Sequence, residues 1–306
     1  MISSRTPSPQ PPAPAAASRP LPEEVIAICA AERDALARRL ARVRHDIKGV
    51  LNSEMLLFCA LSRHLGVDTV IESGRARGNS TQVLAEYFAG PGGASICSVE
   101  YFKYTEDSLI ALRRLGGRYP NLRLLFGDAF VLLPRLCARA GPCTVLIDGP
   151  KGKYALQLAA RLLRDGAVRA VFIHDSHLDS EIRPAMERLY PRTFSSDHGD
   201  FVAAFSSLDG PCWEVYRNWD GYRDWGPWVR GIRRMRSYGP TLTAIFNTPG
   251  GIDREAEVTR LFNLPPLATV DPLPVKLRRG LRAAVPRLSE IPCFLRYLGL
   301  RLSRKA

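Results

Sequence analysis

Five strand-like segments alternate with five helix-like segments between residues 66 and 189, and this alternation constrains the fold more than any other feature. The strand-like segments are residues 67–72, 94–100, 122–126, 143–148 and 168–174, and the helix-like ones are 80–88, 105–115, 131–139, 154–164 and 180–189. Several strands are apolar on both faces, which is typical of parallel strands covered by helices. The pattern therefore predicts a doubly wound, mostly parallel α/β sheet with ligand-binding residues just after the strands.

The N-terminal part of the chain differs from this alternating region. Residues 1–22 are mostly Pro, Ala and Ser and are predicted to be disordered. Residues 23–65 have helical periodicity and are predicted to form N-terminal helices, with Gly66 as the C-cap. The apolar face of this region is expected to consist of Val25, Ile28, Leu36, Leu40 and Val43.

The C-terminal part predicts a further strand and two less regular regions. Residues 241–246 read as a late strand at the sheet edge, which extends the domain to residues 66–250. Within it, residues 197–240 are rich in Trp and Tyr and are predicted to form an insertion or lid. The aromatic side chains at 213–228 would stack on an acceptor or, equally, pack a subdomain against the sheet. Residues 251–306 are predicted to form a basic C-terminal helical extension.

The net charge of +13 is unevenly distributed. Residues 273–306 hold nine Lys or Arg and one Glu, and residues 1–22 hold two Arg and no acid. Residues 23–272 are therefore nearly neutral, with a net charge of +3, which disfavours nucleic acid as a partner of the folded domain. The basic, amphipathic stretch at 291–302 predicts either peripheral contact with an anionic membrane or a helix packed on the domain.

The cysteines and the hydropathy pattern indicate the compartment. The seven cysteines are an odd number without paired metal-ligand spacing, which predicts free thiols in a reducing environment. No run of 18 apolar residues exists, and residues 1–22 lack the apolar segment of a secretory signal. A cytoplasmic location is therefore expected, and a homodimer is left open.

The first strand leads into a glycine-containing turn at residues 72–81. Gly74 and Gly78 would let the backbone turn tightly and approach a ligand. Ser80 or Thr81 would cap the following helix, whose N-terminal amides favour an anionic group. Such a loop suits a ligand with a single carboxylate better than a pyrophosphate, because the spacing is not that of the dinucleotide fingerprint.

Acidic residues follow the next two strands. Glu100 at the end of the second strand could accept hydrogens from both hydroxyls of a ribose. Asp128 after the third strand could take a hydrogen from the amino group of adenine. A nucleoside-containing ligand at this edge of the sheet is therefore predicted.

These residues resemble the motifs of class I S-adenosylmethionine-dependent methyltransferases. The resemblance covers about residues 66–178 and implies a Rossmann-like seven-stranded sheet and an S-adenosylmethionine site. That site would be formed by Glu72, Gly74, Gly78, Ser80, Glu100 and Asp128. The segment Asp148-Gly-Pro-Lys-Gly-Lys-Tyr154 looks like the D-x-x-K-x-x-Y turn of catechol and caffeoyl-CoA type O-methyltransferases, and sugar and antibiotic O-methyltransferases are similar too.

The same resemblance implies roles for residues after the fourth and fifth strands. Asp148 and Asp175 would be oxygen ligands of Mg²⁺, and Lys151 would accept the proton of the substrate hydroxyl or stabilise its oxyanion. Ser176 stands where the family has an Asn ligand, and His174 precedes the aspartate. His174 is therefore an alternative general base in an enzyme that needs no metal.

Arg75, Arg77 and Lys153 are further basic residues near the predicted site. Either arginine could pair with the carboxylate of the ligand, meet an anionic substrate at the mouth, or point to solvent. The expected function is O-methylation of a hydroxyl on a small molecule or a sugar- or lipid-linked acceptor. The alternatives are a nucleic-acid methyltransferase and a non-catalytic module that attaches to a membrane or a partner through the basic tail.

Overall fold

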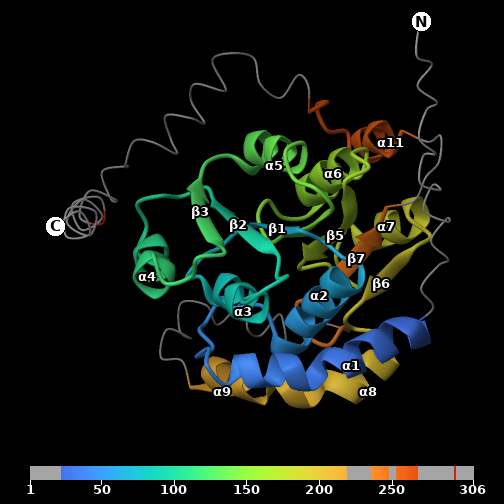
Figure 1. Cartoon of the computed structure of the whole chain (residues 1–306). Coiled ribbons are helices and arrows are strands. Elements are labelled where there is room, and N and C mark those ends of the chain that lie inside the picture. Colours follow the sequence, from blue (N-terminus) through green and yellow to red (C-terminus); the bar gives the residue numbers. More distant parts are fainter. Residues whose placement is uncertain (1–21, 219–235, 248–252, 268–292, 294–306) are drawn as a thin grey trace, which may run out of the picture.

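A seven-stranded sheet forms the centre of the protein, as seen in a computed structural model that describes residues 22–218, 236–247, 253–267 and 293 (Figure 1). The strand order is β3-β2-β1-β4-β5-β7-β6, with β1 to β5 parallel and β7 antiparallel to both β5 and β6. The strands are β1 (Thr69–Ser73), β2 (Ser95–Glu100), β3 (Leu122–Phe126), β4 (Cys143–Ile147), β5 (Val168–His174), β6 (Thr193–Ser195) and β7 (Leu242–Phe246). The predicted doubly wound, mostly parallel sheet is confirmed.

Helices cover both faces of this sheet and bury two separate apolar clusters against it. The helices after β1 to β5 are α3 (Asn79–Tyr87), α4 (Glu106–Leu115), α5 (Ala129–Cys137), α6 (Lys153–Leu162) and α7 (Arg183–Leu189). In Figure 1, α5, α6 and α7 lie on one side of the sheet, and α1, α2 and α3 lie on the other. Strands β4 and β7 are buried along their whole length, which explains why their sequences are almost continuously apolar.

The N-terminal region consists of two helices, α1 (Pro22–Leu40) and α2 (Asn52–His64). The predicted apolar face is confirmed, because Val25 and Leu36 are fully buried. Gly66 follows α2 with φ 61°, the left-handed backbone expected after a helix. Helical structure over residues 41–51 was predicted and is wrong. That segment forms turns and extended backbone that pack on α3 and α9, so tertiary contacts outweigh its helical periodicity.

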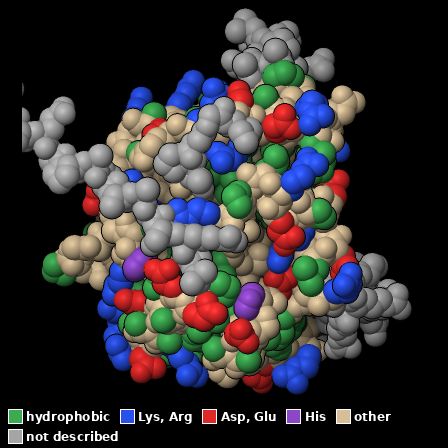
Figure 2. Space-filling view, turned by 90° about the vertical axis from the view of Figure 1, so that its right-hand side faces the viewer, with side chains coloured by type: hydrophobic (Ala, Val, Ile, Leu, Met, Phe, Trp, Pro, Cys, Tyr) green, Lys and Arg blue, Asp and Glu red, His purple; other side chains and the backbone are tan. Residues whose placement is uncertain are grey.

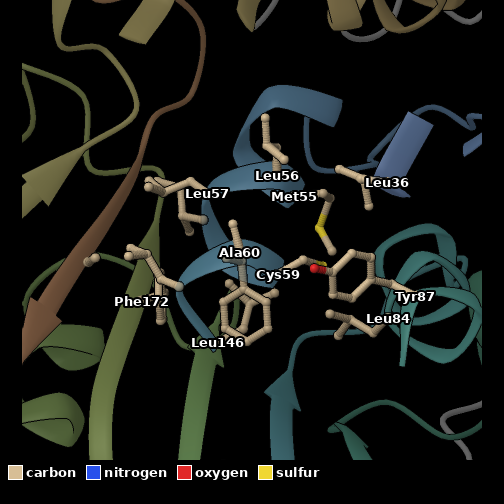
Figure 3. Packing of buried hydrophobic residues seen from close by; sticks show 14 of the residues in the cluster. Leu36, Met55, Leu56, Leu57, Cys59, Ala60, Leu84, Tyr87, Leu146 and Phe172 are labelled. Atoms are coloured by element: carbon tan, nitrogen blue, oxygen red, sulfur yellow. The ribbon is translucent and has the colours of Figure 1, made fainter. Parts of the chain in front are cut away.

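Helix α2 is part of the domain core rather than an appendage. Residues 52–62 are all buried, and Figure 3 shows Met55, Leu57 and Ala60 of this helix among side chains of α1, α3, β4 and β5. Phe172 of β5 packs edge-to-face on Phe58 of α2 at 4.6 Å between ring centroids. Each such buried side chain contributes about 1.5–3 kcal/mol to folding, so α2 is firmly attached to the sheet.

Several short elements were not predicted. They are β6, α8 (Gly199–Phe205), the 3-10 helix η1 (Ser206–Asp209) and α9 (Gly210–Arg217). A three-residue strand and one- or two-turn helices are too short to show a clear period. Helix α11 (Arg254–Leu261) lies in the predicted C-terminal helical extension and packs on α6, where Gln157 donates hydrogen bonds to Thr259 and to the carbonyl of Pro265.

Several other predictions fall partly or wholly outside the described residues. They concern disorder at 1–22, stacking by the aromatic segment 213–228, of which residues 219–228 lie outside, and the basic tail at 273–306. The cytoplasmic location, the homodimer and the membrane contact likewise stay predictions. All seven cysteines are free thiols. Among the described helices, none has the length and apolarity needed to cross a membrane.

Candidate active site

The candidate site lies at the carboxyl ends of β1, β4 and β5, where the direction of sheet winding reverses between β1 and β4. The loops after β1 and β4 touch directly, because the backbone N–H groups of Asp148 and Gly149 donate to the carbonyl of Ser73 at 2.8 and 3.0 Å. A Cβ at Gly74 would lie 2.6 Å from the Gly149 nitrogen, and φ at Gly74 is 93°. Glycine is therefore required at Gly74 for close approach of the two loops.

Glu72 stabilises the glycine loop from the protein interior. Its carboxylate is fully buried and accepts hydrogen bonds from the hydroxyls of Ser80 (2.5 Å), Ser98 (2.6 Å) and Thr81. Burial raises the pKa of Glu72, and the three hydroxyl donors oppose that effect. The prediction that Ser80 or Thr81 caps α3 is wrong. Both hydroxyls turn to Glu72, and the N-cap position is held by Gly78 without a side-chain hydrogen bond.

Gly78 lets α3 begin close to α4. Its φ is 79°, and a Cβ there would lie 2.6 Å from Leu115 Cδ1. Glu72, Gly74, Gly78 and Ser80 thus shape the loop through contacts within the protein, and direct contact of any of them with a cofactor stays a prediction.

Glu100 lies at the end of β2, beside the same loop. Its Oε2 accepts from the backbone N–H of Ala76 at 3.0 Å, and its Oε1 accepts from that of Phe102 at 3.2 Å. The side chain is partly exposed, so a ligand can reach it. Asp128 is the N-cap of α5 and accepts from the N–H of Phe130 at 2.9 Å. The structure therefore brings Glu100 to the glycine loop, and it gives Asp128 a capping role beside the predicted binding role.

Arg75 points neither to solvent nor to the mouth of the site. It is 1% exposed, donates to the carbonyl of Ser98 at 2.8 Å, and lies over the ring of Phe126 at 4.8 Å. Arg77 pairs with Asp107 and with the loop residue Asp46, at 2.8 and 3.2 Å. The two arginines therefore tie the glycine loop to β2 and β3 and to residues 41–51.

Four charged side chains converge after β4 and β5. The Lys151 ammonium lies 2.6 Å from Asp175 Oδ2 and also bonds to Asp148 Oδ1. His174 Nδ1 lies 2.6 Å from Asp148 Oδ1 and 3.5 Å from Asp175 Oδ1. Asp175 has φ 58°, an unfavourable backbone conformation for a residue other than glycine and one that is concentrated at functional sites. The four residues predicted from the sequence thus form one contiguous cluster.

The charges in this cluster stabilise one another. Burial raises the pKa of Asp148, but Lys151 and His174 outweigh it and lower the value to about 2. Burial lowers the pKa of Lys151, yet Asp148 and Asp175 raise it above its usual range. Burial also lowers the pKa of His174, whereas Asp148, Asp175 and Glu54 raise it well above normal. Near neutral pH the site therefore holds an ionised Asp148 carboxylate facing two cations.

The side chains here do not fit the oxygen set that Mg²⁺ prefers. Ligand atoms of Asp148, His174 and Asp175 lie within 4.8 Å of one another, but one of them is an imidazole nitrogen. The Ser176 hydroxyl is fully buried and bonds to Thr243 Oγ1 at 2.7 Å and to the carbonyl of Ile173 at 2.9 Å, so it turns away from the cluster. Lys151 already bridges the two carboxylates. Magnesium ligation by Asp148 and Asp175 therefore stays a prediction without structural support.

Glu54 is a member of this site that the sequence did not reveal. It is the third residue of α2, is 1% exposed, and its Oε2 lies 3.3 Å from His174 Nε2. The same oxygen accepts from the backbone N–H of Leu51 at 2.9 Å. A glutamate near a helix N-terminus reads as a helix cap, and nothing in the local sequence places it beside β5.

The chain is only weakly similar to known proteins. No protein-family model and no curated protein matches the chain. The O-methyltransferase TomG from Streptomyces achromogenes, in complex with SAM, is 17% identical over 74% of this chain and 90% of its own, with a TM-score of 0.40. An SAH-bound methyltransferase from Podospora anserina is 15% identical over 74% and 95%, with a TM-score of 0.37. The SAH-bound O-methyltransferase from Bacillus cereus is 15% identical over 73% and 89%, with a TM-score of 0.36.

TM-scores this low assign neither substrate nor cofactor to the chain. The class of fold follows from the sheet itself. Its strand order and its antiparallel β7 form the Rossmann-like arrangement of class I methyltransferases that the motifs predicted.

Proposed function

We propose that this protein is an S-adenosylmethionine-dependent methyltransferase that acts on a hydroxyl group of a small-molecule or sugar- or lipid-linked acceptor. The proposal rests mainly on the Lys151 ammonium, which bridges the carboxylates of Asp148 and Asp175. This bridge lies next to the glycine loop, where the direction of sheet winding reverses between β1 and β4. Glu100 at the end of β2 supports it, because a carboxylate there suits the ribose of the cofactor.

The charge of the site fits this cofactor. Glu54, Asp148 and Asp175 supply three carboxylates within reach of the two cations Lys151 and His174. The cluster is therefore one negative charge in excess when all five groups are ionised. When bound, the cofactor supplies an electrophilic methyl group on a positively charged sulfur, and a site with negative excess favours such a ligand.

Asp175 and Lys151 are best placed to act on the acceptor. Their side chains are 34% and 50% exposed, whereas those of Asp148 and His174 are 14% and 8% exposed. The acceptor oxygen loses its proton to the Asp175 carboxylate, and the Lys151 ammonium stabilises the negative charge that develops on that oxygen. With the cofactor bound, this oxygen would take the methyl group, and the electron pair of the sulfur–methyl bond would leave with S-adenosylhomocysteine.

His174 has a supporting role in this mechanism. Both of its ring nitrogens face carboxylates, Nδ1 toward Asp148 and Nε2 toward Glu54, so neither nitrogen is open to an acceptor. Asp148 likewise orients Lys151 and is itself mostly buried. The competing hypothesis of His174 as the general base requires the ring to leave at least one of these carboxylates.

Calorimetric titration with S-adenosylhomocysteine tests the cofactor. We expect the wild type to bind with a micromolar dissociation constant. Glu100→Ala should weaken this binding by about tenfold or more, because it removes hydrogen bonds to a charged carboxylate. Lys153→Ala is the matched control, because this residue lies in the same region but in no ion pair of the described structure. Absence of binding to the folded wild type contradicts the proposal.

Acceptor screening with a chelator tests the chemistry. Methyl transfer to hydroxylated compounds should persist when divalent cations are removed, because protein cations already neutralise the two carboxylates. Activity that disappears in chelator and returns with Mg²⁺ would instead support the ligation by Asp148 and Asp175 that the sequence motif implies.

A further inference from the structure

We propose that Glu54 is a positioning residue of the acceptor site, acting through His174 to hold the carboxylate of Asp148 in place. The catalytic part of this inference rests on the proposed function, whereas the chain of contacts exists independently of it. The chain runs from α2 through the end of β5 to the end of β4, and so joins an N-terminal helix to the loop that carries Lys151.

The contacts form an unbroken series of charged groups. Glu54 Oε2 lies 3.3 Å from His174 Nε2, His174 Nδ1 lies 2.6 Å from Asp148 Oδ1, and that same oxygen bonds to Lys151. Glu54 and His174 are 1% and 7% exposed. A contact between buried charges at these distances is screened little by water, so it restrains both partners.

Capping of α2 does not explain why Glu54 carries a charge. The hydrogen bond from the Leu51 N–H needs only an acceptor, which a glutamine oxygen supplies equally well. Oε1 of Glu54 is buried and has no hydrogen-bond partner among the described residues. A buried carboxylate that is only partly satisfied is costly unless a nearby donor compensates it, and the His174 ring lies 3.3 Å from its other oxygen.

A second carboxylate beside Glu54 increases that cost. Asp209 accepts from the backbone N–H and the hydroxyl of Ser53, at 2.8 and 2.7 Å, and so also caps α2. Burial raises the pKa of Asp209 to about 6, the hydrogen bonds from Ser53 lower it, and the charge of Glu54 raises it. Helix α2 already has an acidic cap in Asp209, so the position of Glu54 is best explained by its contact with His174.

The contact fixes the state of the His174 ring. An imidazole that donates to carboxylates on both sides carries hydrogen on both nitrogens and cannot rotate without breaking a charged hydrogen bond. Held in this way, it keeps Asp148 Oδ1 directed at Lys151. Without the Glu54 carboxylate, Nε2 loses its partner at 3.3 Å and the ring can rotate, which leaves Asp148 and Lys151 less well placed.

The test compares two isosteric changes of buried carboxylates at the start of α2, Glu54→Gln and Asp209→Asn. Only the first touches the His174 ring, and both remove a charge from the same helix terminus. The readouts are the ¹⁵N signals of the His174 ring at one neutral pH, assigned with His174→Asn, the dissociation constant of S-adenosylhomocysteine, and kcat and KM for the acceptor.

We expect Glu54→Gln to shift the Nε2 signal, because the ring loses its charged partner at 3.3 Å, and to lower kcat by about tenfold or more, the value of a charged hydrogen bond. The affinity for S-adenosylhomocysteine should change less than about twofold, since the Glu54 side chain bonds to Leu51 and His174 and to no residue of the glycine loop in the described structure. Asp209→Asn should leave the ring signals and kcat close to those of the wild type, although it lowers the melting temperature.

Unchanged ring signals in folded Glu54→Gln overturn the inference, and so does an equal response to Asp209→Asn. A loss of kcat without a change at His174 also overturns it, because that result means general destabilisation. The ring signals do not depend on the cofactor. If the ring signals respond to Glu54→Gln but the wild type binds no S-adenosylhomocysteine, the proposed function is refuted and the Glu54–His174 contact stays supported.

Discussion

The two halves of the site use charged residues in opposite ways. On the β1–β3 side, Glu72 and Arg75 are fully buried and bonded to neighbouring strands and to the start of α3, so they hold the backbone of the glycine loop in shape. On the β4–β5 side, Lys151 and Asp175 pair with each other and remain partly open to solvent. Charged side chains of the glycine loop therefore serve the fold, whereas those after β4 and β5 remain accessible, as acid–base chemistry requires.

The largest effect is expected for the exposed half of the site. Lys151→Met should lower kcat by about 100-fold or more, because removal of a group that stabilises developing charge typically costs this much. The affinity for S-adenosylhomocysteine should stay within a few-fold of the wild type. Steady-state kinetics and calorimetry measure the two quantities, and Lys153→Met is the control. A normal kcat in Lys151→Met would contradict a catalytic role of Lys151.

Substitution in the buried half should act on stability instead. Arg75→Ala removes a buried cation that interacts electrostatically with Glu100 and Glu72, and it should lower the free energy of unfolding by about 3–5 kcal/mol. Denaturant unfolding measures this change. Arg77→Ala, in which the lost side chain is 24% exposed, is expected to cost no more than about 1 kcal/mol. Equal costs for the two arginines would mean that the burial of Arg75 adds nothing to its contribution to stability.

The ion pairs of Asp148 predict a pH dependence of stability. Its pKa is lowered from 3.8 to about 2 in the folded state, so its contribution is complete above pH 4 and is lost as the pH falls toward 2. That contribution amounts to about 2 kcal/mol. Unfolding measured at several acidic pH values should show a steeper loss for the wild type than for Asp148→Asn. Parallel curves would mean that Asp148 is not held by Lys151 and His174.

The smallest effect concerns the segment 41–51 that lies over the glycine loop. Lys48 pairs with Asp107 at 2.6 Å, and Asp107 also pairs with Arg77. Both partners of the Lys48 pair are about one-quarter exposed, so Lys48→Ala should cost about 0.5–1 kcal/mol. Thermal melts at low and high salt check this, since screening should shrink the difference. A difference that is independent of salt would assign the effect to packing of the lysine stem.

Much of the fold could be predicted from the sequence, because the patterns that mark strands and helices are local. The third and fifth strands were predicted with the bounds that the structure gives, Leu122–Phe126 and Val168–His174. Apolar runs of this length, followed by a turn and an amphipathic segment, are typical of βα units. The break at residues 41–51 was not readable, because it arises from contacts such as that of the Tyr216 hydroxyl with the Gly49 carbonyl, 167 residues away.

Some features of the candidate site could likewise be predicted from the sequence, and others could not. The convergence of Asp148, Lys151, His174 and Asp175 was predictable, since neighbouring strands of a parallel sheet end at one edge. The inward turn of Arg75 and the hydrogen bonds that Glu72 makes to Ser80 and Ser98 were not, because a loop sequence does not show which face of the loop is covered. Glu54 was missed because a long-range contact with β5 leaves no periodic signal around residue 54.

The order of strands and helices along the chain, the glycine turn and the residues at the strand ends could be predicted, because they follow from periodicity and from chain connectivity. Only packing in the folded protein selects which of those side chains face solvent and which contact the core. It also decided that an N-terminal glutamate meets His174 at the end of β5. Burial and charge pairing depend on packing between distant segments, and that packing sets the chemistry of Lys151, His174 and the carboxylates around them.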